Sequence, residues 1–170
     1  MTSLDDSPCP FSDSSADVYV WSVDGRPFKL HNVILSLASG YLKNMLNPAR
    51  TEYEGLPSFY FPEHSNVLDP LFRLCYPVDD PPLDSIDEVR STLEAAQKYQ
   101  MREAMKITKR KLLAFAESEP MRVYAIASQM GLEDVALDAA KEILRQEAQY
   151  TYTDELETIP ASAYSRLLAF

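Results

Sequence analysis

The stretch that decides the fold runs from Asp17 to Leu46 and reads DVYVWSVDGRPFKLHNVILSLASGYLKNML. Its first third is rich in β-branched and aromatic residues, which favour strands. Asp24-Gly25 then supplies a strong hairpin signal, because a tight turn between two strands needs positive φ. The sequence therefore predicts a hairpin, with strands over 18–23 and 26–30.

The period of the pattern changes at His31. Beyond it, apolar residues recur at helical spacing, namely Leu30, Ile34, Leu37, Tyr41 and Met45. Gly40 interrupts this run, and the hydroxyl of Ser39 can cap a new helix by accepting a backbone N–H bond. We therefore expect two short helices, over about 31–38 and 40–46, with His31 at the corner between strand and helix.

The next hundred residues alternate between turn signals and apolar segments. NPARTEYEGLP at 47–57 is predicted to be a loop, and SFYFPEH predicts a third strand over 58–61 with Phe59 and Phe61 on one face. A helix is expected over 66–76. The two adjacent prolines of PVDDPP at 77–82 exclude its continuation.

The sequence after residue 82 predicts helices. Ser85 and Glu88 form a capping box ahead of an apolar stripe. The helices are expected over about 86–99, 102–115, 118–130 (with Ser118 as the cap) and 132–146, with a short one before Phe170. Strands at the start and helices afterwards predict an α+β fold, in which helices cover a small, mostly antiparallel sheet.

Composition excludes several function classes. The formal net charge is −10, and an acidic chain repels phosphate backbones, so we expect no nucleic-acid partner. No run approaches the length of a membrane span, and the polar segment 1–15 is neither a secretory signal nor well suited to order. Cys9 and Cys75 do not suggest a disulfide, which favours a reducing compartment, cytoplasmic or nuclear.

The titratable residues form no pattern typical of an enzyme. His31 and His64 share no recurring ligand spacing with the cysteines, so no metal is expected. Asp79 and Asp80 lie between prolines, where a solvated loop is the simpler interpretation than an acid–base pair. Cys75 has no histidine in a triad-like context, and no glycine-rich phosphate loop is present. The sequence therefore predicts no catalytic residue and no cofactor.

One combination of residues resembles the opening of BTB/POZ domains. In order, the matching residues are Asp17-Val18, Phe28, His31, Leu35-Ser36, Ser39 and Tyr41, followed by LFRLCYP at 71–77. PMRVYAIASQMGLEDVALDAAKEIL at 120–144 is similar to the BACK-like helical hairpins that follow BTB domains in adaptor proteins. LCYPVDDPPL at 74–83 most resembles BTB proteins of basidiomycete fungi. The expected organisation is a flexible segment over 1–15, a BTB/POZ domain over 16–116 and a helical extension over 117–170.

The resemblance implies a protein–protein interaction module, an adaptor or scaffold that links an unknown substrate to a cullin-type ubiquitin ligase. The alternative is a self-assembly module of a transcriptional or cytoskeletal complex. The partner-binding residues it implies are Phe61, Glu63, Phe72, Tyr76 and Asp79. The structural residues it implies are Asp17, His31 and Ser39. Phe61 could instead face the core, since a buried aromatic residue is common.

Two departures from the family pattern bear on self-association. Many family dimers exchange an N-terminal helix and strand, but few and mostly polar residues precede Asp17. Several also carry a basic residue directly after the histidine, where this chain has Asn32. We therefore expect a monomer, or a dimer built without a segment swap.

Overall fold

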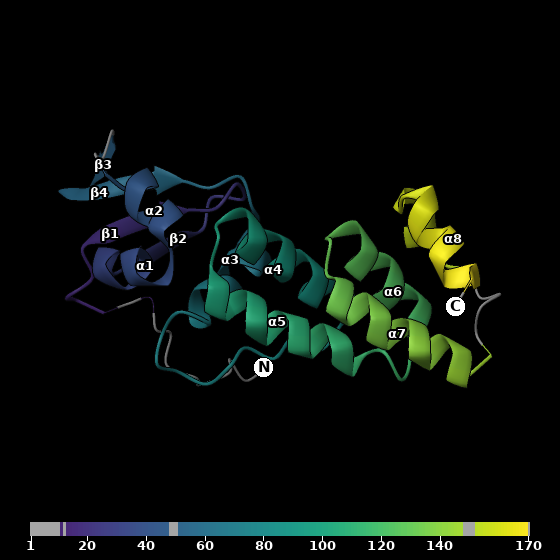
Figure 1. Cartoon of the computed structure of the whole chain (residues 1–170). Helices are drawn as coiled ribbons and strands as arrows, with labels where there is room; N and C mark the ends of the chain where they lie inside the picture. Colours follow the sequence, from purple (N-terminus) through teal and green to yellow (C-terminus); the bar gives the residue numbers. More distant parts are fainter. Residues whose placement is uncertain (1–10, 12, 48–50, 148–151, 170) are drawn as a thin grey trace. The chain divides into compact units, whose positions relative to one another are not determined.

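The computed structural model describes Phe11 and residues 13–47, 51–147 and 152–169. These residues form two compact units (Figure 1). The first unit contains the described residues up to Pro82 together with Ala95–Met105, and the second contains Leu83–Glu94 and the described residues from Lys106 onward. None of the described helices is both long enough and apolar enough to cross a bilayer.

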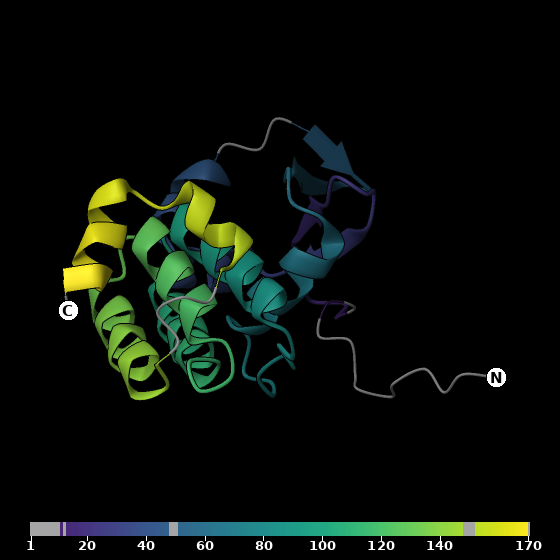
Figure 2. The same cartoon turned by 90° about the vertical axis from the view of Figure 1, so that its right-hand side faces the viewer.

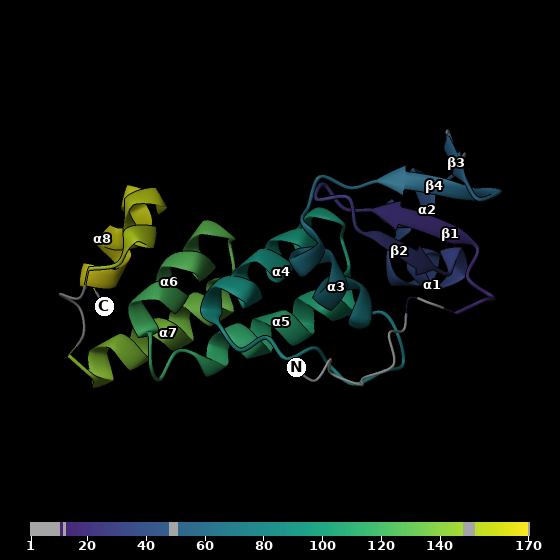
Figure 3. The ribbon, with the colours of Figure 1, turned by 180° about the vertical axis from the view of Figure 1, so that it is seen from behind.

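The sheet of the first unit has four strands in the described residues. They are β1 (Val18–Trp21), β2 (Pro27–Leu30), β3 (Thr51–Tyr53) and β4 (Leu56–Tyr60). Their order is β2-β1-β4-β3, and β1 runs parallel to β4 whereas the other two pairings are antiparallel (Figure 3). The predicted hairpin is confirmed in β1 and β2.

Both hairpins depend on left-handed backbone positions. Gly25 has a φ of 79° and closes the first turn by donating its N–H to the carbonyl of Ser22 at 3.0 Å. Glu54 and Gly55 have φ values of 52° and 76°, which makes them the two central residues of a tight turn between β3 and β4. The prediction of a loop over 47–57 is therefore wrong at β3.

The helices of the first unit are α1 (Asn32–Ala38), α2 (Gly40–Met45) and α3 (Ser65–Arg73), and Figure 1 shows α1 and α2 beside the strands. The remaining elements are α4 (Ile86–Lys98), α5 (Arg102–Ala114), α6 (Pro120–Gln129), α7 (Glu133–Arg145), the 3₁₀ helix η1 (Asp154–Thr158) and α8 (Ala161–Ala169). The α+β class is thus confirmed, and the sheet is mostly antiparallel as expected, with one parallel pairing between β1 and β4.

Local capping explains where α4 begins but not where α6 does. The Ser85–Glu88 capping box is present: the N–H of Glu88 donates to the Ser85 hydroxyl, and the N–H of Ser85 donates to the Glu88 carboxylate, both at 3.2 Å. The predicted cap at Ser118 is wrong. Its hydroxyl donates to the Phe115 carbonyl at 3.3 Å, and Glu119 occupies the N-cap position of α6.

The core of the first unit is built on aromatic pairs. Phe72 of α3 lies edge-on to Phe28 of β2 at 5.5 Å and to Phe61 at 6.1 Å, measured between ring centroids. Phe61 in turn contacts Tyr99 at 5.0 Å. Such pairs contribute about 0.5–1.5 kcal/mol each beyond the apolar area they bury. They join β2, α3 and the end of α4 into one packed layer.

The second unit is organised around the α6–α7 hairpin, in which Gly131 supplies the turn with a φ of 69°. Figure 2 shows the C-terminal segment, in yellow, running alongside this green pair. Arg122 of α6 lies at the centre of a charged cluster. Its guanidinium donates to Glu155 at 2.7 Å, Asp87 at 2.6 Å and Glu119 at 3.0 Å. The hydrogen bond to Glu155 outweighs the effect of burial and raises the pKa of Arg122.

Candidate interaction surfaces

The corner between strand and helix is held by side chains from three segments. His31 lies with Nδ1 3.1 Å from the Tyr76 hydroxyl and Nε2 2.9 Å from the Ser15 hydroxyl. The backbone N–H of His31 also donates to Tyr76 at 2.9 Å. The Asp17 carboxylate accepts the N–H of Asn32 at 2.7 Å and so satisfies a donor at the start of α1, where His31 makes no side-chain cap. These contacts are structural in kind.

Ser39 connects α2 to the end of α4. Its hydroxyl accepts the N–H of Leu42 at 3.1 Å, the capping bond that the sequence pattern predicts, and donates to the Tyr99 carbonyl at 2.5 Å. Because Ser39 is buried, its hydroxyl cannot reach water, and these two bonds satisfy its hydrogen-bonding capacity instead.

Glu63 takes part in an internal ion pair, although the family resemblance placed it at a partner surface. Its side chain is 14% exposed, and the carboxylate accepts from Lys98 Nζ and from the Tyr99 hydroxyl, each at 2.5 Å. Burial, and then this hydrogen bond, raise the pKa of Tyr99 well above its ordinary value. A partner could reach Glu63 only by competing with both donors.

The other implied partner residues divide between core and surface. The structure places Phe61 and Phe72 in the core, 2% and 0% exposed, so neither ring is available as an anchor. The hydroxyl of the half-buried Tyr76 is already hydrogen-bonded to the backbone N–H and to Nδ1 of His31. Asp79, in the loop after α3, is the exposed member of the set.

A groove of about 1290 Å³ lies on the first unit, between α1, α2, the end of α3 and the α4–α5 junction. Cys75 and Pro77 line one side of it, next to the exposed residues Val78, Asp79 and Asp80. Burial raises the pKa of the Cys75 thiol to about 12, so it is protonated and unreactive at neutral pH. This side of the groove therefore offers no thiolate nucleophile.

An apolar stripe borders this groove, and the sequence pattern gave no sign that it faces solvent. We use "α1–α2 stripe" for Val33, Leu37 and Tyr41, which are 62%, 83% and 42% exposed. Helical spacing had grouped Leu37 and Tyr41 with core residues. The kink at Ser39 breaks the helical period, and Leu35 and Leu42 are buried instead.

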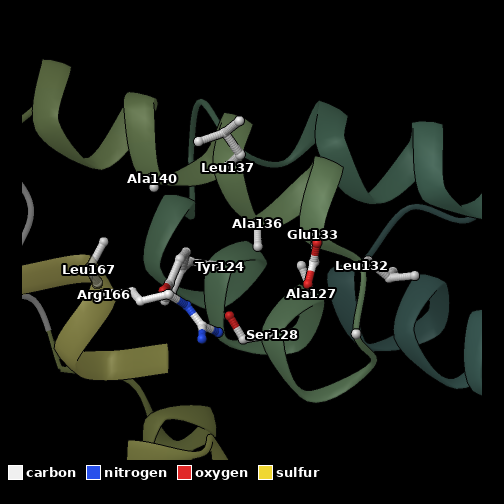
Figure 4. A pocket seen from close by; sticks show the side chains of 11 residues that line it. Tyr124, Ala127, Ser128, Leu132, Glu133, Ala136, Leu137, Ala140, Arg166 and Leu167 are labelled. Carbon is white, nitrogen blue, oxygen red and sulfur yellow. The ribbon is translucent and has the colours of Figure 1, made fainter. Parts of the chain in front are cut away.

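The second unit carries a smaller pocket of about 420 Å³ between α6, α7 and α8. Its floor is made of small and apolar side chains such as Ala127, Ala140 and Leu167. Figure 4 shows Arg166 of α8 reaching along it toward Ser128 of α6. An apolar floor with few polar groups is typical of a binding pocket.

The described residues hold no group of three or more histidine, cysteine, aspartate or glutamate side chains that could bind a metal ion. The features that the two units do offer are grooves and exposed apolar side chains. Together with the small mixed sheet and its helical cover, these features define a binding module.

The comparison with protein families identifies the kind of module. The model of the BTB/POZ domain matches residues 11–116, which is more than half of the chain, and the chain therefore belongs to the BTB/POZ family. Domains of this family bind other proteins, and protein–protein interaction is accordingly the role of this one. A comparison with curated proteins found no significant match.

Proposed function

We propose that this chain is an adaptor whose BTB/POZ domain binds a cullin-type ubiquitin ligase scaffold and whose helical extension over 117–170, of the BACK-like kind, binds a substrate. The observation that carries the proposal is the exposed loop Pro77–Asp80 beside the groove of the first unit. The family resemblance implies a scaffold contact in this part of the fold.

The loop has the properties of a protein contact. Pro77 restricts the backbone, so the loop loses little conformational entropy when a partner binds. Val78 is 40% exposed and lies beside the exposed carboxylates of Asp79 and Asp80. An apolar side chain with an acidic rim suits a partner surface that is apolar and basic.

The test is calorimetry between this protein and the N-terminal domain of a cullin from the same organism. Binding in the micromolar range is expected, and Asp79→Lys should weaken it about tenfold through charge reversal at the contact. Glu117→Lys, at an exposed acid of the second unit, is the matched control and should bind normally. Undetectable binding at high micromolar concentration would refute the ligase role. Equal binding by both variants would place the contact elsewhere.

A second function, self-assembly in a transcriptional or cytoskeletal complex, is favoured by the α1–α2 stripe. Three exposed apolar side chains on adjacent helices form the kind of patch that buries itself against a second copy. Light scattering across a range of concentrations tests this function, and Leu37→Glu should abolish any dimer. A dimer that persists in Leu37→Glu but dissociates when residues 1–15 are deleted would indicate a segment swap instead.

A further inference from the structure

A third surface lies on the first unit and shares no residue with the groove or with the ion pair described above. It is the sheet face opposite the buried side chains of Val18 and Val20. Because side chains alternate along a strand, β1 points Tyr19 and Trp21 away from these valines. We use "aromatic face" for the cluster that results, namely Tyr19, Trp21, Tyr53 and Tyr60.

The register of the sheet brings these rings together. Trp21 and Tyr60 are direct partners across β1 and β4, with ring planes 19° apart and centroids 6.2 Å apart. Tyr53 of β3 lies edge-on to Trp21 at 5.0 Å and to Tyr19 at 5.1 Å. The rings thus support one another, so the surface is ordered before a ligand arrives.

Exposure shows that the aromatic face is a surface and not part of the core. Tyr60 is 72% exposed and Tyr53 is 42% exposed. Among the residues that the structure describes, neither hydroxyl has a hydrogen-bond partner in the protein, so each can donate to a ligand carbonyl. The face therefore offers flat rings for stacking, with donors at their edges.

Charged side chains of both signs lie beside the aromatic face. Glu54 is exposed in the turn after β3, and the hydroxyl of Tyr19 donates to its carboxylate at 2.9 Å, which holds that carboxylate next to the rings. Lys29 lies across from Tyr19 on β2 and is a basic residue on this side of the sheet. With a formal net charge of −10, the protein favours a cationic ligand over a phosphate-bearing one.

We propose that the aromatic face binds an extended, proline-rich and basic segment of a partner protein. Such a segment adopts a polyproline II helix without internal hydrogen bonds, so its carbonyls remain free to accept from the tyrosine hydroxyls. Its proline rings pack on aromatic faces, as in other domains that bind proline-rich segments through aromatic-lined grooves. Arginines at one end of the segment would meet Glu54 and the net negative charge of the protein. This site is separate from the proposed scaffold contact and does not depend on it.

Trp21 makes the proposal directly measurable, because it is the one tryptophan of the chain and lies in the aromatic face. The probe is a synthetic peptide of about ten residues, mostly proline with two arginines at one end, long enough for about three polyproline II turns. We expect a saturable change in Trp21 emission on titration. Tyr60→Ala should weaken binding about tenfold, the upper end of what one aromatic contact contributes.

Three controls decide the outcome. Tyr164→Ala removes a tyrosine of α8 that is 40% exposed and should bind the peptide normally. A peptide with glutamates in place of the arginines should bind more weakly, since it meets Glu54 and the net negative charge of the protein with like charge. Circular dichroism should show that Tyr60→Ala remains folded, as expected for a side chain that is mostly exposed.

The proposal would be overturned by any of three results. The first is no change in emission at millimolar peptide. The second is equal binding by Tyr60→Ala and Tyr164→Ala, or by the acidic peptide. The third is tighter binding of single-stranded oligouridine than of the peptide, which would make the face a base-stacking surface.

Discussion

Replacing Glu63 by glutamine provides a sharp test of how the first unit is held together. In the structure the carboxylate accepts from the Tyr99 hydroxyl and from Lys98 Nζ and is only 14% exposed. A hydrogen bond to a charged group contributes about 1.5–3 kcal/mol, whereas an ion pair with a half-exposed lysine contributes at most about 1 kcal/mol. Glutamine keeps one neutral acceptor for Tyr99. We therefore expect Glu63→Gln to lower the free energy of unfolding by about 1–2 kcal/mol.

The assay is urea denaturation followed by the emission of Trp21, which lies in the same unit as Glu63. With an ordinary dependence on urea, the expected loss moves the midpoint down by roughly 0.5–1 M. Glu52→Gln removes an exposed carboxylate from the same unit and is the matched control, with an expected change within about 0.5 kcal/mol.

A double-mutant cycle with Tyr99→Phe isolates the hydrogen bond itself. If the bond stabilises the unit, the two substitutions should couple by about 1 kcal/mol or more. Coupling within about 0.3 kcal/mol of zero, or a Glu63→Gln midpoint equal to that of Glu52→Gln, would contradict the structural role. Glu63 would then again be a candidate for partner binding.

Three further substitutions test other parts of the fold. Tyr76→Phe removes the hydroxyl that contacts His31 and should cost about 1–2 kcal/mol, measured by urea denaturation. Gly25→Ala places a side chain at a φ of 79° and should cost about 1 kcal/mol in the same assay. Burial opposes ionisation of Glu155, but its bonds to Arg122 outweigh burial and lower its pKa below 4.5. This stabilisation is present above pH 4.5 and is lost as the pH falls through the lower folded pKa of Glu155. The cost of Arg122→Gln, about 2 kcal/mol at pH 7, should therefore shrink progressively in thermal melts at pH values decreasing below 4.5.

The parts of the fold that were predictable from the sequence rest on local chemistry. The Asp24-Gly25 turn, the change of period at His31 and the Ser85–Glu88 capping box each depend on residues a few positions apart, so the pattern carries the geometry. Strand β3 was missed because its turn places Glu54 at a φ of 52°, where glutamate is uncommon and gives no recognisable hairpin signal.

The candidate site was less predictable, because its residues are assigned by contacts between distant segments. Glu63 pairs with Lys98 and Tyr99, more than thirty positions away, and no local pattern indicates that pairing. The kink at Ser39 likewise turns Leu37 outward, although its spacing in the sequence resembles that of a core residue. Periodicity predicts which residues share a face of a helix or strand, but not whether that face packs against the core or is exposed to solvent.

Tyr60 and Phe61 show how this distinction governs function. They are neighbours in the sequence and both aromatic, yet Tyr60 is 72% exposed while Phe61 is 2% exposed. Alternation along an extended chain directs Phe61 toward Phe72 and Tyr99 and leaves Tyr60 stacked beside Trp21 on the open side of the sheet. A one-residue shift of register would exchange them, removing a core ring and a surface ring together. The buried aromatic pairs that set the register of the sheet therefore also set which rings are available to a partner.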